Sequence, residues 1–285
     1  MRPENRPFVS PDDVLLAAHP GSGRSWISTL LTHLDVCVLA TDDERLVDQT
    51  SQASGGWFPE AERGPAYLGD AASERRRSVL VADQERHLPQ RAARHARTSP
   101  YPETLRVLET HRAPLDWTPP GRVVLLVRDG RDAVLSLYHN LKSFSGLEAS
   151  LEQYLSGNDG AWLQPARAWA FFCMGWLGAV SDEHLHVLRF ESAREDPRAE
   201  FSALLRFLRI ERDAADLDRA IEESSYRRMR TLETEAIASE GDTIGKGRVM
   251  RAGKVEGWRA ELSKELLGTF EGMPSRALRR FGYRE

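Results

Sequence analysis

The stretch VLLAAHPGSGRSWISTLL, residues 14–31, constrains the fold more than any other part of the chain. An apolar run over 14–18 ends before a glycine-rich turn at 19–23, and apolar residues then recur with helical spacing over 25–34. This order predicts a short buried strand, a turn and a helix. Small residues in such a turn let backbone N–H groups approach an anion at the positive end of the helix, which indicates a phosphate site.

Further apolar runs predict more strands of the same sheet. RVVLLVRD at 122–129 is a continuous apolar run, typical of parallel strands covered on both faces. TLRVLETH at 104–111 and HLHVLRF at 184–190 are further strand candidates, and helical patterns separate these runs. Strands alternating with helices predict an α/β fold with a mostly parallel sheet.

The 285 residues are enough for one large domain or two small ones. Residues 41–104 are polar, contain arginine clusters and show no second core, so we expect an insertion that shapes a binding site above the scaffold. Its aromatic residues Trp57, Phe58 and Tyr67 are candidates for the pocket walls. The glycine-rich segment 241–257 is basic and is expected to act as a mobile lid over a phosphate.

Composition restricts the partners. The formal net charge is -4, so general attraction to nucleic acid or to an anionic membrane is not expected. The polar, proline-rich N-terminus lacks the apolar core of a signal peptide, and the longest apolar run, 168–180, is too short to span a bilayer. We expect a cytoplasmic protein with no nucleic-acid and no membrane partner. The bias toward arginine and alanine suggests a GC-rich bacterial gene.

The phosphate turn departs from the Walker pattern of a glycine, four residues and Gly-Lys-Ser/Thr. Ala18 replaces the first glycine and Arg24 replaces the lysine, which disfavours an ordinary ATPase or kinase. Trp26 would stack on a base or pack in the core. The candidate contacts to an anion and its base are Gly21, Ser22, Gly23, Arg24, Ser25 and Trp26.

Arg128 marks a second candidate phosphate contact. It follows the strand predicted at 122–129 and so lies at the carboxyl edge, where ligands bind in open α/β sheets. Its planar guanidinium suits phosphate oxygens. Ser136, one or two helical turns further on, would direct a hydroxyl at the same anion. The alternative for Arg128 is an ion pair with Asp129 or Asp132.

These pieces, in this order from about Leu15 to Trp258, resemble the cytosolic sulfotransferase family, whose donor is 3'-phosphoadenosine-5'-phosphosulfate (PAPS). VVLLVRDGRDAVLSLYH is similar to the family's 3'-phosphate segment. HPGSGRSW resembles the 5'-phosphosulfate loop YPKSGTTW, and LETHRAP resembles KTHLP. GAWLQPARAW resembles G-S-W-x-x-H-V-x-x-W, RFESAREDP resembles Y-E-D…P, ESSYRRM resembles T-S-F…M, and RAGKVEGW resembles RKGxxGDW.

The resemblance implies a single sulfotransferase-like domain, 1–285, with a P-loop-containing three-layer α/β/α fold and a central parallel sheet. It also implies in-line transfer of a sulfuryl group from PAPS to a hydroxyl or amine, releasing 3',5'-adenosine bisphosphate (PAP). It implies that no metal takes part in the reaction and that the acceptor is a small molecule. Whether the protein forms a homodimer stays open. His111 matches the family's catalytic base, and Glu109 is the alternative base. The other matched residues bind the nucleotide: Arg128 and Ser136 at the 3'-phosphate, Ser224 and Tyr226 beside the adenine, and Arg251 and Gly253 in the lid.

The departures from the family lie near the reacting sulfur. The loop lysine is Gly21 here, the lysine before the catalytic histidine is Glu109, and the second basic lid residue is Ala252. Our hypothesis is that Arg24 supplies the missing charge, with Arg112 as a weaker candidate, because a preorganised charge at the reacting group is worth on the order of 10²–10³ in rate.

Three other functions stay open at this point. The first is a P-loop phosphotransferase using ATP, with Asp129 as its magnesium ligand. The second is a PAP-binding protein of the same fold that lacks catalysis, and the third is an enzyme that uses an aryl sulfate as donor. The acceptor expected for a bacterial sulfotransferase of this kind is a secondary metabolite, phenolic or sugar-bearing, or a carbohydrate.

Overall fold

A single parallel sheet forms the centre of the protein. The structure is a computed structural model that describes residues 9, 11–40, 105–115, 117–144, 147–157, 164–231, 234 and 253–284. Within these residues the sheet has five strands in the order β2-β3-β1-β4-β5. They are β1 (Val14–Ala18), β2 (Cys37–Ala40), β3 (Arg106–Thr110), β4 (Arg122–Val127) and β5 (Leu185–Arg189).

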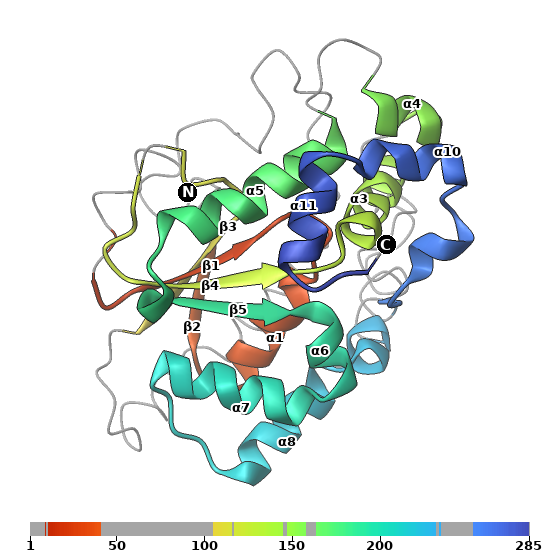
Figure 1. The fold of residues 1–285 in the computed structure, drawn as a ribbon. Coiled ribbons are helices and arrows are strands. Elements are labelled where there is room, and N and C mark those ends of the chain that lie inside the picture. The colour runs from red at the N-terminus through yellow and green to blue at the C-terminus, as the bar shows by residue number, and fades with distance from the viewer. Residues whose placement is uncertain are drawn as a thin grey trace, which may run out of the picture.

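Helices cover both faces of this sheet (Figure 1). One face carries α1 (Arg24–His33), α6 (Phe190–Glu195), α7 (Pro197–Leu208) and α8 (Ala214–Glu223). The other carries α3 (Gly130–Phe144), α5 (Pro165–Ala179) and α11 (Met273–Arg280), with α4 (Leu151–Ser156) and α10 (Lys264–Leu267) beside them. Short 3-10 turns occupy Asp182–His184, Gly257–Ala260 and Gly268–Phe270. The predicted three-layer α/β/α arrangement is confirmed.

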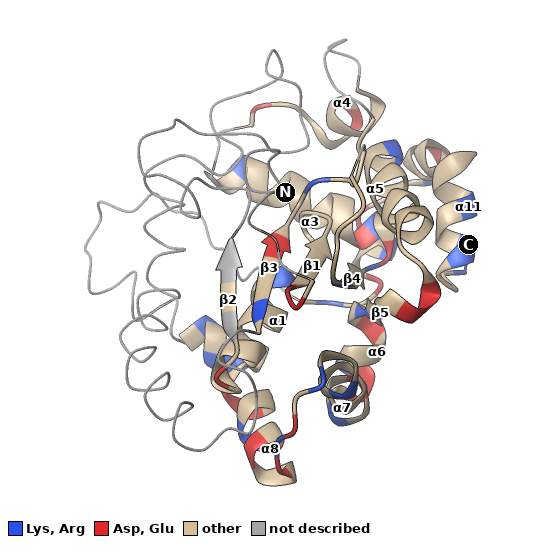
Figure 2. Cartoon of the chain, turned by 90° about the vertical axis from the view of Figure 1, so that its left-hand side faces the viewer, with Lys and Arg blue, Asp and Glu red and all other residues tan. Residues whose placement is uncertain are grey.

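The apolar runs form strands because both of their faces are buried. All five residues of β1 are buried, and alternate side chains enter different cores. Leu15 packs with residues of α3 and α5, whereas Leu16 packs with residues of α1 and α7. Seen from the side, charged residues lie mainly on the outer helices such as α7 and α8, and the strands between the layers are mostly uncharged (Figure 2).

The predicted strands at 14–18, 104–111, 122–129 and 184–190 are all present, with the three longer runs trimmed at their ends. The predicted helix over 25–34 begins one residue earlier, at Arg24. The sequence did not predict the four-residue β2 or the helices α6, α8 and α11.

The expected insertion 41–104, with its three aromatic candidates, lies outside the described residues, as do residues 241–252 of the expected lid. Within the described ranges, each helix is too short or too polar to cross a lipid bilayer.

Candidate active site

The loop between β1 and α1, residues 19–23, lies at the carboxyl edge of the sheet and is shaped by two glycines. Gly21 has φ 84° and Gly23 has φ 98°, in the left-handed region that favours glycine. The Ser22 N–H donates to the His19 carbonyl at 3.1 Å and so closes the turn. The Trp26 N–H donates to the Gly23 carbonyl at 3.1 Å as α1 begins.

This loop is pressed between α3 and α6. A Cβ atom on Gly21 would lie 2.3 Å from the Ala133 carbonyl oxygen, and one on Gly23 would lie 2.7 Å from Cδ2 of Phe190. Contacts under about 3 Å force a neighbour to move, and the Ala133 carbonyl belongs to the helix backbone. In this loop conformation, therefore, no side chain fits at Gly21, and this includes the side chain of lysine.

The residues of the loop fit an anion. Gly23 is the N-cap of α1 and makes no side-chain cap, and the first turn carries no acidic residue. The first N–H groups of a helix need acceptors, and the helix dipole favours negative charge there. In addition, the hydroxyl of Ser22 is buried and has no hydrogen-bond partner among the described residues. A phosphate oxygen would satisfy both the helix terminus and this buried hydroxyl.

Arg128 joins this loop to the C-terminal segment. Its Nη1 donates to the Gly21 carbonyl at 2.8 Å, and its Nη2 donates to the Lys254 carbonyl at 2.9 Å. The guanidinium carbon lies 4.6 Å from the centre of the Phe190 ring. The side chain is buried, so the end of β4 holds a cation beside the phosphate loop, as the sequence predicted.

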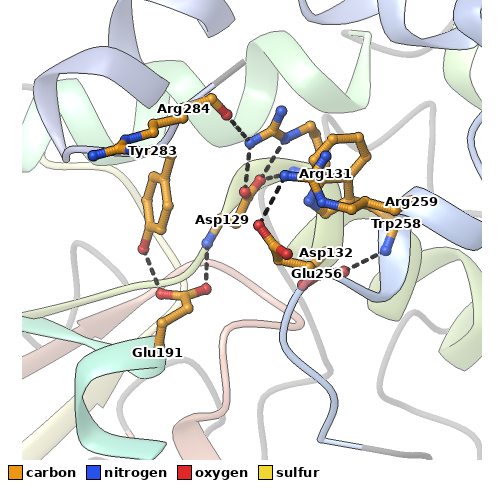
Figure 3. Close-up of polar contacts among 9 residues, drawn as sticks. All are labelled: Asp129, Arg131, Asp132, Glu191, Glu256, Trp258, Arg259, Tyr283 and Arg284. Carbon is orange, nitrogen blue, oxygen red and sulfur yellow. Dashed lines mark hydrogen bonds and ion pairs between the residues drawn. The ribbon is translucent and has the colours of Figure 1, made fainter. Parts of the chain in front are cut away.

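The alternative ion pair of Arg128 with Asp129 is not formed, because Asp129 binds Arg131. Nε and Nη2 of Arg131 donate to its carboxylate at 2.9 and 2.7 Å (Figure 3). Asp132 does interact electrostatically with Arg128, which lowers the pKa of this carboxyl, but burial is the larger effect and raises it overall. Arg128 thus lies among backbone acceptors with Asp132 as its acidic neighbour.

The first turn of α3 is anchored to the residues that follow the expected lid (Figure 3). The Trp258 N–H donates to Oδ1 of Asp132 at 2.8 Å. Arg131 stacks on the Trp258 ring at 3.9 Å and donates to the Arg284 carbonyl at 2.6 Å. Because Arg128 and Asp132 both bind the backbone of residues 254–258, the start of α3 fixes this segment at two points.

Phe190 and Glu191 are site residues that the sequence reasoning did not single out. Phe190 lies beneath the loop and contacts Arg128, and Glu191 accepts the Asp129 N–H at 2.9 Å (Figure 3). Glu191 also accepts the Tyr283 hydroxyl at 2.7 Å, and burial together with Glu191 raises the pKa of Tyr283 well above its ordinary value. Both residues belong to RFESAREDP, so the resemblance of this stretch to the family's Y-E-D…P segment was the signal that pointed to them.

His111 follows β3 and is buried beside the end of β1. Its Nδ1 lies 2.6 Å from the Ala18 carbonyl oxygen. A carbonyl only accepts hydrogen bonds, so Nδ1 carries the proton and the neutral ring has its lone pair on Nε2. This tautomer suits a general base.

Arg24 and Glu109 meet at the head of α1. Nη1 of Arg24 lies 3.3 Å from Oε2 of Glu109, and the two side chains are only 11% and 9% exposed. The Ser28 hydroxyl donates to Oε1 of Glu109. Both carboxylate oxygens of Glu109 therefore have partners on α1.

The residues expected around the adenine form a second group. Ser224 is buried at the end of α8, where its hydroxyl donates to the Ile221 carbonyl at 3.3 Å. Gly253, with φ 55°, lies against Tyr226: a Cβ there would be 3.4 Å from the Tyr226 ring. Gly253 directly precedes Lys254, which binds Arg128, so this group adjoins the phosphate loop through the chain itself.

The remaining predicted residues are less informative. Trp26 packs edge-on against Phe190 and Phe201, with ring centres 5.6 and 5.3 Å away, so the core-packing role is present and base stacking stays a prediction. Ser25 and Ser136 are half-buried on α1 and α3. Arg251 lies outside the described residues. Among the residues that are described, no three His, Cys, Asp or Glu side chains are grouped to hold a metal ion.

The fold and the loop define an α/β protein with a turn that fits an anion at the carboxyl edge of its sheet. The chain belongs to the sulfotransferase family, since the family model described as "Sulfotransferase domain" matches residues 11–282. The sequence resemblance to this family is thereby confirmed.

Individual relatives are distant. Sulfotransferase 1B1 of Canis lupus familiaris is 24% identical over 229 residues, which cover 77% of this chain and 67% of that protein. Cytosolic sulfotransferase 8 of Arabidopsis thaliana is 27% identical over 158 residues, 52% of this chain and 46% of that protein. The chain thus matches less than half the length of the Arabidopsis protein.

Two solved structures share the fold at 16% sequence identity. Mouse sulfotransferase SULT7A1 complexed with PAP superposes with a TM-score of 0.60, covering 97% of this chain and 87% of that one. Retinol dehydratase in a complex with retinol and PAP gives a TM-score of 0.62, covering 99% and 86%.

Restoring the family's lysine at Gly21 is expected to damage the loop. Gly21→Lys places a Cβ against the Ala133 backbone at a φ of 84°, and strain of this kind costs about 1–3 kcal/mol of stability. We expect a lower urea midpoint and weaker PAP binding. Gly268→Lys, at an exposed position with no heavy atom within 4 Å of the new Cβ, is the control. Unchanged stability with faster sulfuryl transfer in Gly21→Lys would contradict this account.

His19 is expected to make stability depend on pH. Its buried ring donates from Nδ1 to the Pro20 carbonyl at 2.8 Å, and burial lowers its pKa from 6.5 to about 4. The unfolded chain therefore binds more protons between these values, so stability falls as the pH drops from about 6.5 to about 4, by roughly 3 kcal/mol from this residue.

Urea unfolding of the wild type and of His19→Asn, measured from pH 4 to 7, tests this. The difference in stability between the two proteins should shrink as the pH falls. His184→Asn, at an exposed histidine, is the control and should leave a constant difference. A constant difference for His19→Asn as well would show that the ring does not titrate in this way.

Proposed function

We propose that this protein transfers a sulfuryl group from PAPS to a hydroxyl or amine of a small-molecule acceptor and releases PAP. The acceptor oxygen or nitrogen attacks sulfur in line, the bond from sulfur to the bridging oxygen of the 5'-phosphate breaks, and the acceptor proton passes to a base. The donor supplies the activated sulfuryl group. The protein contributes positioning, a base and positive charge.

The observation that carries this proposal is the position of Arg128. A buried guanidinium bound to the Gly21 carbonyl and the Lys254 carbonyl lies between the phosphate loop and the last residues of the expected lid. A nucleotide with phosphates at both its 5' and 3' positions needs a cation beside the loop. An ordinary Walker ATPase would instead use a loop lysine, and Arg24 occupies that position here. The PAP complexes of the two structural neighbours agree with this choice.

His111 is the base in this proposal. Its Nδ1–H bond to the Ala18 carbonyl fixes the ring and leaves the lone pair on Nε2, the nitrogen that would take the acceptor proton. Arg24 supplies positive charge in place of the lysine that Gly21 excludes. Glu109 remains the alternative base by its place in the sequence, two residues before His111.

The remaining parts of the proposal concern the surroundings of the reaction. We expect the acceptor to be a secondary metabolite or a sugar of a bacterial cell, with residues 41–104 on the acceptor side and 241–257 as the lid. We expect one domain over 1–285, cytoplasmic, with no metal in the reaction.

Calorimetric titration tests the nucleotide half of the proposal. The wild type should bind PAP at least tenfold more tightly than 5'-AMP, ADP or ATP with magnesium. Arg128→Ala should lower PAP affinity by about 10- to 100-fold and 5'-AMP affinity much less, because only PAP carries the 3'-phosphate and a charged hydrogen bond is worth about 1.5–3 kcal/mol. Arg122→Ala, at the opposite end of β4, is the matched control and should keep the preference for PAP.

The outcomes separate the rival functions. Preference for ATP with magnesium, or no binding of PAP, would overturn the PAPS assignment. If Arg128→Ala weakened PAP and 5'-AMP equally, Arg128 would act by holding the Gly21 loop instead of reading the 3'-phosphate.

Transfer itself is tested with radiolabelled PAPS and a panel that contains a phenol, an aliphatic alcohol, an amine and a sugar. The wild type should label at least one acceptor class. His111→Gln should lower the rate about 10²- to 10⁴-fold, the usual contribution of general base catalysis, while PAP binding stays within about twofold. PAP binding with no labelled product from the wild type would favour a binding protein or an aryl sulfate donor, which the same assay tests with p-nitrophenyl sulfate and PAP.

A further inference from the structure

The strongest unexplained feature of the molecule is the buried ion pair at the head of α1. The Arg24 and Glu109 side chains lie 3.3 Å apart and are 11% and 9% exposed. A charge removed from water to this degree persists only with a partner, and a pair persists only when its hydrogen bonds are satisfied. The pair is also directly beside the loop that fits a phosphate.

Arg24 occupies a position that is unfavourable for a cation. It is the first residue of α1, where the helix dipole and the free N–H groups favour negative charge, and no acidic residue is present in the first turn to offset it. Glu109, on the neighbouring strand β3, provides the required negative charge from outside the helix.

The sheet and α1 together direct the carboxylate of Glu109 to this point. Glu109 is paired with Leu16 of β1 in the parallel register, and Leu16 packs in the core that contains α1. Side chains at paired positions of neighbouring strands lie on the same face. On that face Ser28, one helical turn after Arg24, donates its hydroxyl to the second carboxylate oxygen. Glu109 is therefore held from α1 at both of its oxygens.

From this geometry we infer that Glu109 is a positioning residue: it holds the Arg24 guanidinium at the phosphate loop, where Arg24 contacts the sulfuryl group of the bound donor. This inference rests on the proposed function and assigns Glu109 a role distinct from that of a base. A base must offer an oxygen to the acceptor proton, whereas Oε1 and Oε2 bind Ser28 and Arg24. The glutamate thus acts through the arginine.

A comparison of PAPS with PAP isolates this contact without knowledge of the acceptor, because PAPS has the sulfuryl group and PAP lacks it. Calorimetry on Arg24→Gln, Glu109→Gln and the double variant gives both dissociation constants for each protein. We expect Arg24→Gln to weaken PAPS about tenfold, equivalent to about 1.4 kcal/mol. PAP affinity should change less than about twofold.

Glu109→Gln should weaken PAPS in the same direction, and the double variant should be no weaker than Arg24→Gln alone. This lack of additivity is the signature of a residue that acts only through another. Urea unfolding confirms that each variant folds. If Glu109→Gln is unfolded, Glu109→Asp, which draws the charge back by one methylene group, serves in its place.

The matched control is a second ion pair that involves β3, between Arg106 of this strand and the buried carboxylate of Asp13. Nε and Nη2 of Arg106 donate to Asp13 at 2.8 and 2.6 Å, at the opposite end of the strand. Arg106→Gln and Asp13→Asn remove a similar pair and should lower stability without changing the ratio of PAPS to PAP affinity.

Three results would overturn the inference. These are equal loss of PAPS and PAP affinity in Arg24→Gln, unchanged or tighter PAPS binding in Glu109→Gln, and additive losses in the double variant. Each is distinct from failure of the proposed function, in which the wild type would bind neither PAP nor PAPS.

Discussion

The hydrogen bonds of the Arg128 guanidinium hold the site together. They link the carbonyl of Gly21, in the first loop of the chain, to the carbonyl of Lys254, near its end, and the group is buried at the end of β4. Hydrogen bonds from a charged donor are worth about 1.5–3 kcal/mol each and are stronger where water is excluded. Two segments that are far apart in the sequence therefore take their positions from one side chain. A phosphate bound there would find the cation already placed, which is the condition for electrostatic preorganisation.

The same loop limits which elements can place a positive charge beside it. Gly21 lies so close to the backbone of α3 that no side chain fits, so a cation must come from another element. Arg24 can provide it, but the first residue of a helix is a poor place for a cation. The carboxylate of Glu109, on the strand β3, offsets this unfavourable position by pairing with Arg24. The Ser28 hydroxyl donates to its other oxygen. Gly21 and Glu109, two of the departures from the family, are thus linked through Arg24 in one arrangement.

Sequence reasoning found what depends on local periodicity. Continuous apolar runs predicted β1, which precedes the loop, and its neighbour β4. The position of Arg128 directly after β4 predicted that its side chain lies near the loop. It could not choose between partners for a charge: Asp129 and Asp132 were both candidates for Arg128, yet Asp129 binds Arg131. The choice depends on the direction of side chains at the start of α3, which no spacing reports. The pair of Arg24 with Glu109 could not be predicted for the same reason, because it joins a helix to a strand that is distant in the sequence. The strand β2 was missed because four residues are too few for a pattern.

The contacts at the start of α3 fix the backbone of residues 254–258 at two points. Arg128 binds the carbonyl of Lys254 and Asp132 binds the N–H of Trp258, so both ends of this short segment are fixed by residues one helical turn apart. Burial raises the pKa of Asp132, and the nearby Arg128 charge and the N–H bonds from the segment lower it, so the carboxylate depends on the segment as much as the segment depends on it. The Arg128 and Asp132 contacts together therefore hold this short segment against the start of α3.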